Sequence, residues 1–67
     1  MTITDDFISA FLVEAAQHRD LKVGLHLSTG ARLFGWVESV EGGVATIETD
    51  GFVIHVRVPH IITAHYA

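Results

Sequence analysis

The chain contains no cysteine and only one proline, Pro59. Without cysteine it can form neither disulfide bonds nor thiolate metal sites, so a fold of this size has to be held together by burial. No apolar run approaches the roughly 18 residues that a membrane-spanning helix needs. Two aspartates stand near the N-terminus, where a secretory signal would carry basic residues. We therefore expect a soluble, cytoplasmic protein that does not act at a membrane.

Basic residues are also scarce. Four lysine and arginine residues face eight aspartate and glutamate residues, which gives a formal net charge of −4 at pH 7. Non-specific binding of nucleic acids is driven by neutralisation of phosphates, so this balance disfavours it, although a local basic or stacking site remains compatible with it. The chain also lacks a phosphate-binding loop, a dinucleotide fingerprint and any serine at a recognisable spacing from a base. We expect no enzymatic activity, no catalytic residues, and neither a cofactor nor a metal ion.

Apolar residues, in contrast, are abundant for so short a chain. They make up 49% of the 67 residues, and the mean hydropathy is +0.41. A domain of this size buries a smaller share of its surface than a large one, so much of this apolar surface has to be exposed in a monomer. Burial against copies of the same chain is the simplest solution. The composition therefore predicts a homo-oligomer.

The spacing of the apolar residues predicts one helix followed by five strands. A stripe at i, i+4 and i+8 predicts a helix over about residues 5–18, formed by Phe7, Ile8, Phe11, Leu12, Ala15 and Ala16. From Leu21 the period changes to two, and glycine-containing turns divide the remainder into strands at about 21–27, 31–41, 44–49, 52–58 and 61–66. Gly35 is expected to bend the second strand. We predict a single domain over residues 1–67 that is mainly β.

The order of these elements resembles that of the Sm-like (LSm) family. The resemblance rests on Gly30 and Gly35, five residues apart, and on a corner at Pro59–His60 before the last strand. Residues 6–12, 27–41 and 60–63 are most similar to the bacterial Hfq branch of this family. The resemblance implies an N-terminal helix followed by a strongly bent, five-stranded antiparallel small barrel, over about residues 21–66. It also implies a cyclic homo-oligomer of about five to seven subunits, in which the fourth strand of one subunit pairs with the fifth strand of the next.

The resemblance further implies that the protein binds single-stranded RNA and acts as an RNA chaperone or scaffold. Of the family's uridine pocket only His60 is retained. Gly43 stands where the family has a stacking ring, and Pro59 where it has a lysine. Arg57 could supply the missing charge. On the opposite face, positions that bind adenine in the family hold residues that can stack or contact phosphate, among them His26 and Arg32.

The predicted RNA-binding residues are therefore His60, Arg57, Arg32 and His26. Trp36, beside the bend glycine, is expected to pack in the core or at an interface. The alternative to RNA binding is an oligomeric structural or protein-interaction ring that has lost useful RNA affinity. The acidic composition and the changed uridine pocket favour this alternative.

Overall fold

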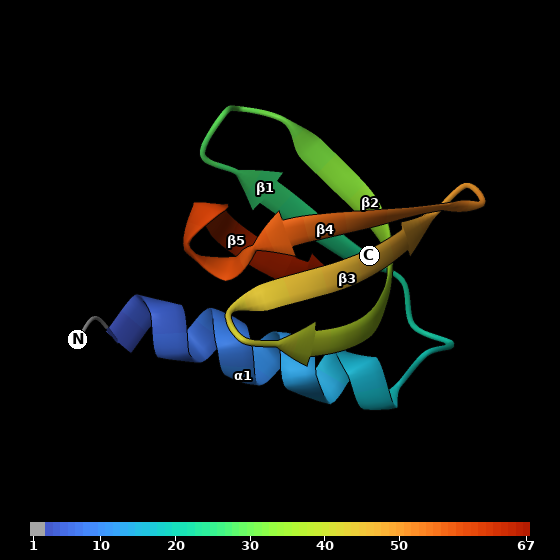
Figure 1. Cartoon of the computed structure of the whole chain (residues 1–67), viewed down its shortest axis with the longest axis horizontal. Coiled ribbons are helices and arrows are strands. Elements are labelled where there is room, and N and C mark those ends of the chain that lie inside the picture. The colour runs from blue at the N-terminus through green and yellow to red at the C-terminus, as the bar shows by residue number, and fades with distance from the viewer. Residues whose placement is uncertain (1–2) are drawn as a thin grey trace.

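The protein consists of one helix followed by five antiparallel strands, as predicted (Figure 1). The computed structural model describes residues 3–67, with side chains described from Phe7 onward. The elements in chain order are helix α1 (Ile3–Gln17), strands β1 (Val23–Leu27), β2 (Arg32–Glu41), β3 (Val44–Thr49) and β4 (Phe52–Arg57), the 3-10 turn η1 (Val58–His60) and strand β5 (Ile61–Tyr66). The fold is therefore mainly β with an N-terminal helix, and its topology is that of the Sm-like fold.

All five strands belong to one sheet, in the order β4-β3-β2-β1-β5. Strand β2 connects the two halves of this sheet. Its first half, up to Gly35, pairs with β1, whereas its second half, from Trp36, pairs with β3. At Gly35 a Cβ atom would overlap the backbone carbonyl oxygen of Glu48. Strand β2 bends where it changes partner, as expected (Figure 1). Only a residue without a side chain allows β3 to approach so closely at this point.

The core lies between α1 and the inner face of the bent sheet (Figure 1). Leu12 of α1 is fully buried, and α1 makes most of its strand contacts with β2. The strands contribute mainly branched aliphatic side chains to this core, namely Val23, Leu25, Val37, Ile47, Val56 and Ile61. Phe7, which the helical stripe placed on the buried face, is instead 73% exposed. Among the described side chains of α1, the first one that is buried is therefore Ile8.

Several predicted boundaries differ from the structure, among them the start of β2, which lies at Arg32 instead of Ala31. The helix runs over Ile3–Gln17, earlier than predicted at both ends. Strand β1 begins at Val23 instead of Leu21, because the Leu21 N–H donates to the carbonyl of His18 and closes a turn. Strand β4 ends at Arg57, and η1 follows, with Pro59 in its first turn. In the described part of the chain, no helix is both long enough and apolar enough to cross a membrane.

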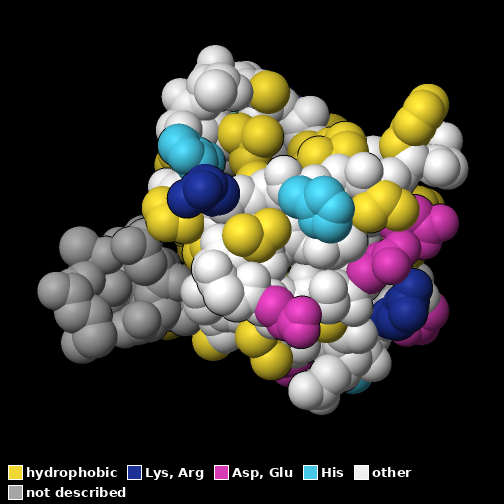
Figure 2. All heavy atoms as spheres, viewed as in Figure 1, with side chains coloured by type: hydrophobic (Ala, Val, Ile, Leu, Met, Phe, Trp, Pro, Cys, Tyr) yellow, Lys and Arg dark blue, Asp and Glu magenta, His cyan; other side chains and the backbone are white. Residues whose placement is uncertain are grey.

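The sheet ends at β4 on one side and at β5 on the other. Both terminal strands expose large apolar side chains. On β4 these are Phe52, Val53 and Ile54, and on β5 they include Ile62, which is 51% exposed. Figure 2 shows such apolar side chains over β4 and beside the β3–β4 turn. The apolar surplus seen in the sequence is therefore concentrated on the two strands that lack a second neighbour.

Candidate nucleic-acid interface

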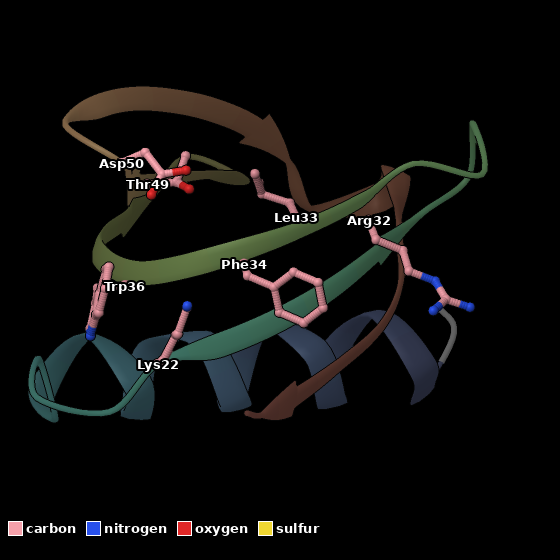
Figure 3. Close-up of a pocket in the computed structure, with 7 residues that line it drawn as sticks. All are labelled: Lys22, Arg32, Leu33, Phe34, Trp36, Thr49 and Asp50. Carbon is pink, nitrogen blue, oxygen red and sulfur yellow. The ribbon is translucent and has the colours of Figure 1, made fainter.

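The outer face of the sheet, turned away from the core, carries a row of basic and aromatic side chains. Arg32, Phe34 and Trp36 alternate along β2 with residues that face inward, so all three point to the outer face. Figure 3 shows the Phe34 ring between Arg32 on one side and Trp36 on the other. His26 of β1 is the direct cross-strand partner of Arg32. Strands β1 and β2 thus bring a cation and three rings onto one surface.

Gly24 of β1 leaves space in the middle of this face. It pairs with Phe34 on one side and with His65 of β5 on the other. A Cβ at position 24 would lie 2.7 Å from Nε2 of His65 and 3.0 Å from a ring carbon of Phe34. The absence of a side chain therefore lets two aromatic rings from neighbouring strands lean over β1.

A depression of about 270 Å³ lies over this region. It is lined by Leu25, His26, Arg32, Phe34, Thr63 and His65. Its two histidines and its arginine can donate hydrogen bonds to phosphate, hydroxyl or base acceptors, and Phe34 offers a ring for stacking. We call this depression the β1–β5 pocket.

A second hollow of about 390 Å³ opens on the other side of Phe34 (Figure 3). It forms because β3 pairs with β2 only from Trp36 onward, so residues 32–35 of β2 have no β3 partner. Its lining is Lys22, Arg32, Leu33, Phe34, Trp36, Thr49 and Asp50. We call it the β2 wedge. Arg32 and Phe34 line both hollows, so the β1–β5 pocket and the β2 wedge are neighbouring parts of one surface.

Lys22 lies over the Trp36 ring in the β2 wedge, with Nζ 5.5 Å from the ring centroid. This distance is within the range of a cation–π contact, which contributes about 0.5–1 kcal/mol at an exposed site. Trp36 is half-buried and is not part of the core, so of the two predicted environments, the core and an interface, the core does not apply and the interface stays a prediction. The wedge therefore has a tryptophan ring at one end, covered by an exposed, flexible ammonium group.

The other two predicted residues, Arg57 and His60, lie at η1. The Ser28 N–H donates to the carbonyl of His60 at 2.7 Å, and Ser28 Oγ lies 3.4 Å from Nδ1 of the same residue. The Val58 N–H donates to the carbonyl of Gly43 at 2.8 Å, so the β2–β3 turn lies against η1. Both Arg57 and His60 are exposed. The η1 corner therefore holds Ser28 against His60 and the β2–β3 turn against Val58.

The four predicted site residues thus form two pairs, Arg32 with His26 on the outer face and Arg57 with His60 at η1. Sequence reasoning missed Phe34, His65 and Lys22. The signal for Phe34 was present, because period-two alternation from Arg32 places it on the same face. The signal for Lys22 was present too, because it alternates with Gly24 and His26, and the β1–β2 register extended past Val23 and Gly35 places it opposite Trp36. His65 could not be found in this way, since its position depends on the pairing of β5 with β1.

No protein-family model matches this chain, and no curated protein matches it significantly in sequence. Among the described residues, no group of three or more histidine, cysteine, aspartate or glutamate side chains is placed to hold a metal ion.

Proposed function

We propose that this protein binds single-stranded RNA on the outer face of β1, β2 and β5. The observation that carries the proposal is the surface shared by the β1–β5 pocket and the β2 wedge. Arg32 and Phe34 stand at its centre, and Lys22 and two histidines surround them. Rings for stacking beside cations for phosphate are the combination with which proteins hold single strands. The proposed role is that of an Sm-like RNA chaperone or scaffold.

The charge distribution is compatible with this proposal despite the net charge of −4. Two of the four lysine and arginine residues of the chain, Lys22 and Arg32, line the outer-face hollows. Asp50 lines the β2 wedge and is the one carboxylate among the residues that line the two hollows. Stacking contributes about 1–3 kcal/mol per base and does not depend on net charge. We therefore expect weak binding of duplex nucleic acid and stronger binding of unpaired strands.

The decisive experiment is fluorescence anisotropy with labelled oligo-A and oligo-U at two salt concentrations. Arg32→Gln should weaken binding about threefold or more, and should lower the slope of log K against log salt by about 0.7 for each phosphate that the variant no longer neutralises. Arg19→Gln is the matched control, because it removes the same charge from the exposed connection between α1 and β1. If no oligonucleotide binds below about 100 μM at low salt, RNA binding is ruled out.

The second part of the proposal is a ring, in which β4 of one subunit pairs with β5 of the next. It is supported by the position of both strands at the ends of the sheet and by their exposed apolar side chains. Edge strands of this kind pair readily with another chain unless charges or covering segments prevent it. A head-to-tail contact whose rotation closes produces a ring of identical subunits.

Native mass spectrometry tests the ring directly. Val53→Lys places a charge on β4 and should shift the protein to monomers. Val13→Lys makes the same change at a residue of similar exposure on α1, 47% against 54%, and should leave the oligomer intact. A wild-type monomer at micromolar concentration would contradict the ring.

The second candidate function is a ring that serves as a structural or protein-interaction module without useful RNA affinity. The η1 corner favours it, because Gly43 offers no ring for stacking and Pro59 offers no charge. The two candidates share the ring and differ in the outcome of the anisotropy experiment.

A further inference from the structure

We propose that Trp36 is a base-stacking residue, and that Lys22 moves from the Trp36 ring to the phosphate of the bound nucleotide. This inference rests on the proposed RNA binding and specifies how the β2 wedge takes part in it. It assigns a role to two residues that the sequence did not connect.

The position of Trp36 supports the first half of the inference. Trp36 follows Gly35 directly, at the point where β2 leaves β1 and joins β3. It therefore lies on the part of β2 that is paired with β3, in register with Glu48. The ring is half-buried and lines the wedge, and the side chain that covers it is an exposed lysine. A base can take the place of Lys22 without any movement of the backbone.

The energetic balance favours this exchange. The cation–π contact between Lys22 and Trp36 lies at an exposed site and is weaker than the stacking of a base on an aromatic ring. The displaced ammonium group of Lys22 exchanges the Trp36 ring for a new partner, because the nucleotide brings a phosphate into the same wedge. Arg32 stands at the other side of Phe34 and can hold the next phosphate along the strand (Figure 3).

The carboxylates beside Trp36 set the orientation of the nucleotide. Glu48 is the cross-strand partner of Trp36, and Asp50 lines the wedge together with Thr49. Both carboxylates repel a phosphate, so the phosphates lie towards Lys22 and Arg32, and the base edge lies towards Thr49 and Asp50. The occupant that fits this charge pattern is a single-stranded nucleotide with its base over Trp36.

Trp36 is the only tryptophan of the chain, so its fluorescence reports on the wedge alone. We expect oligo-A to quench this fluorescence and to protect Trp36 from acrylamide, with the same midpoint as the anisotropy of the labelled oligonucleotide. Trp36→Leu keeps an apolar side chain but removes the ring, and should weaken binding about fivefold or more. Phe7→Leu makes a similar change at an exposed position on α1 and should have no effect.

Lys22→Gln separates the two halves of the inference. It should leave the wedge free, so that Trp36 is more accessible to acrylamide before RNA is added. It should also weaken binding and lower the salt slope by about 0.7, whereas Arg19→Gln should not. If circular dichroism shows that Trp36→Leu does not fold, the Lys22→Gln variant still tests the inference, because it keeps the Trp36 fluorophore.

Two results overturn the inference in different ways. If anisotropy reports binding while Trp36 fluorescence and acrylamide access do not change, RNA binds elsewhere, and the proposed function stands without the wedge. If no oligonucleotide raises the anisotropy, the proposed function fails and the inference fails with it.

Discussion

Replacing Gly35 with alanine tests whether the bend in β2 depends on a missing side chain. The new Cβ would overlap the carbonyl oxygen of Glu48 and lie 3.1 Å from Cγ2 of Ile47. The carbonyl belongs to the backbone of β3 and cannot rotate away, so β2 and β3 have to separate. Overpacking of this kind costs about 1–3 kcal/mol, and a backbone clash belongs at the upper end of that range.

Gly24→Ala is the matched control for this change. Its Cβ would meet the ends of the His65 and Phe34 side chains, both on the solvent-exposed outer face, and these can rotate away. Both substitutions restrict the unfolded chain to a similar degree, a gain of about 0.4–1 kcal/mol that cancels in the comparison. We therefore expect Gly35→Ala to be less stable than Gly24→Ala by about 2–3 kcal/mol.

Thermal and urea unfolding followed by circular dichroism at equal protein concentration measures this difference. For a domain of this size about 2–3 kcal/mol corresponds to a shift in Tm of about 10–20 °C. Equal concentration matters, because self-association raises the apparent stability by mass action. If the two variants unfold within about 0.5 kcal/mol of each other, the close approach at Gly35 does not determine the bend, and the reasoning from sterics is wrong.

Three further predictions concern the core, the hairpin turn and the η1 corner. Leu12→Ala should cost about 2–5 kcal/mol, because Leu12 is fully buried, whereas Val13→Ala on the exposed side of α1 should change stability by less than about 1 kcal/mol in urea unfolding. Gly51→Ala should cost about 1 kcal/mol, because Gly51 has a φ of 84°, and Asp50→Asn should be neutral, because asparagine tolerates the φ of 49° found there. His60→Ala should leave the affinity for oligo-A within about twofold in the anisotropy assay, and a larger loss would place RNA at η1 instead of on the outer face.

The sequence predicted the fold well because each of its signals was local. The period-two alternation, the turn glycines and the Asp50–Gly51 pair act through neighbouring residues, so strands β3 and β5 were predicted with the bounds that the structure has. The errors lie where tertiary contacts decide. Phe7 has the spacing of a buried helical residue, yet it is exposed, whereas its neighbour Ile8 is buried in the core.

The candidate site was harder to predict, because it depends on which strands become neighbours. Arg32 and His26 were predicted from the resemblance to the Sm-like family, and the structure makes them cross-strand partners. His65 joins them only because β5 returns to the far side of β1, opposite Gly24. Lys22 was expected inside a strand, where it would have pointed to solvent. It lies one residue before β1, and the pairing of Val23 with Gly35 places it opposite Trp36.

The proposed RNA binding depends on ring formation, because the chain carries few basic residues. One subunit offers few cations on its outer face, so a single copy can hold only a few nucleotides and binds them weakly. A ring repeats this face at a fixed spacing, and a strand that touches several copies gains affinity without any new kind of contact. An acidic chain can therefore bind RNA usefully when its sheet ends are paired and its outer faces act together. In this view the exposed apolar residues of β4 and β5 contribute to RNA binding, although they lie outside the site.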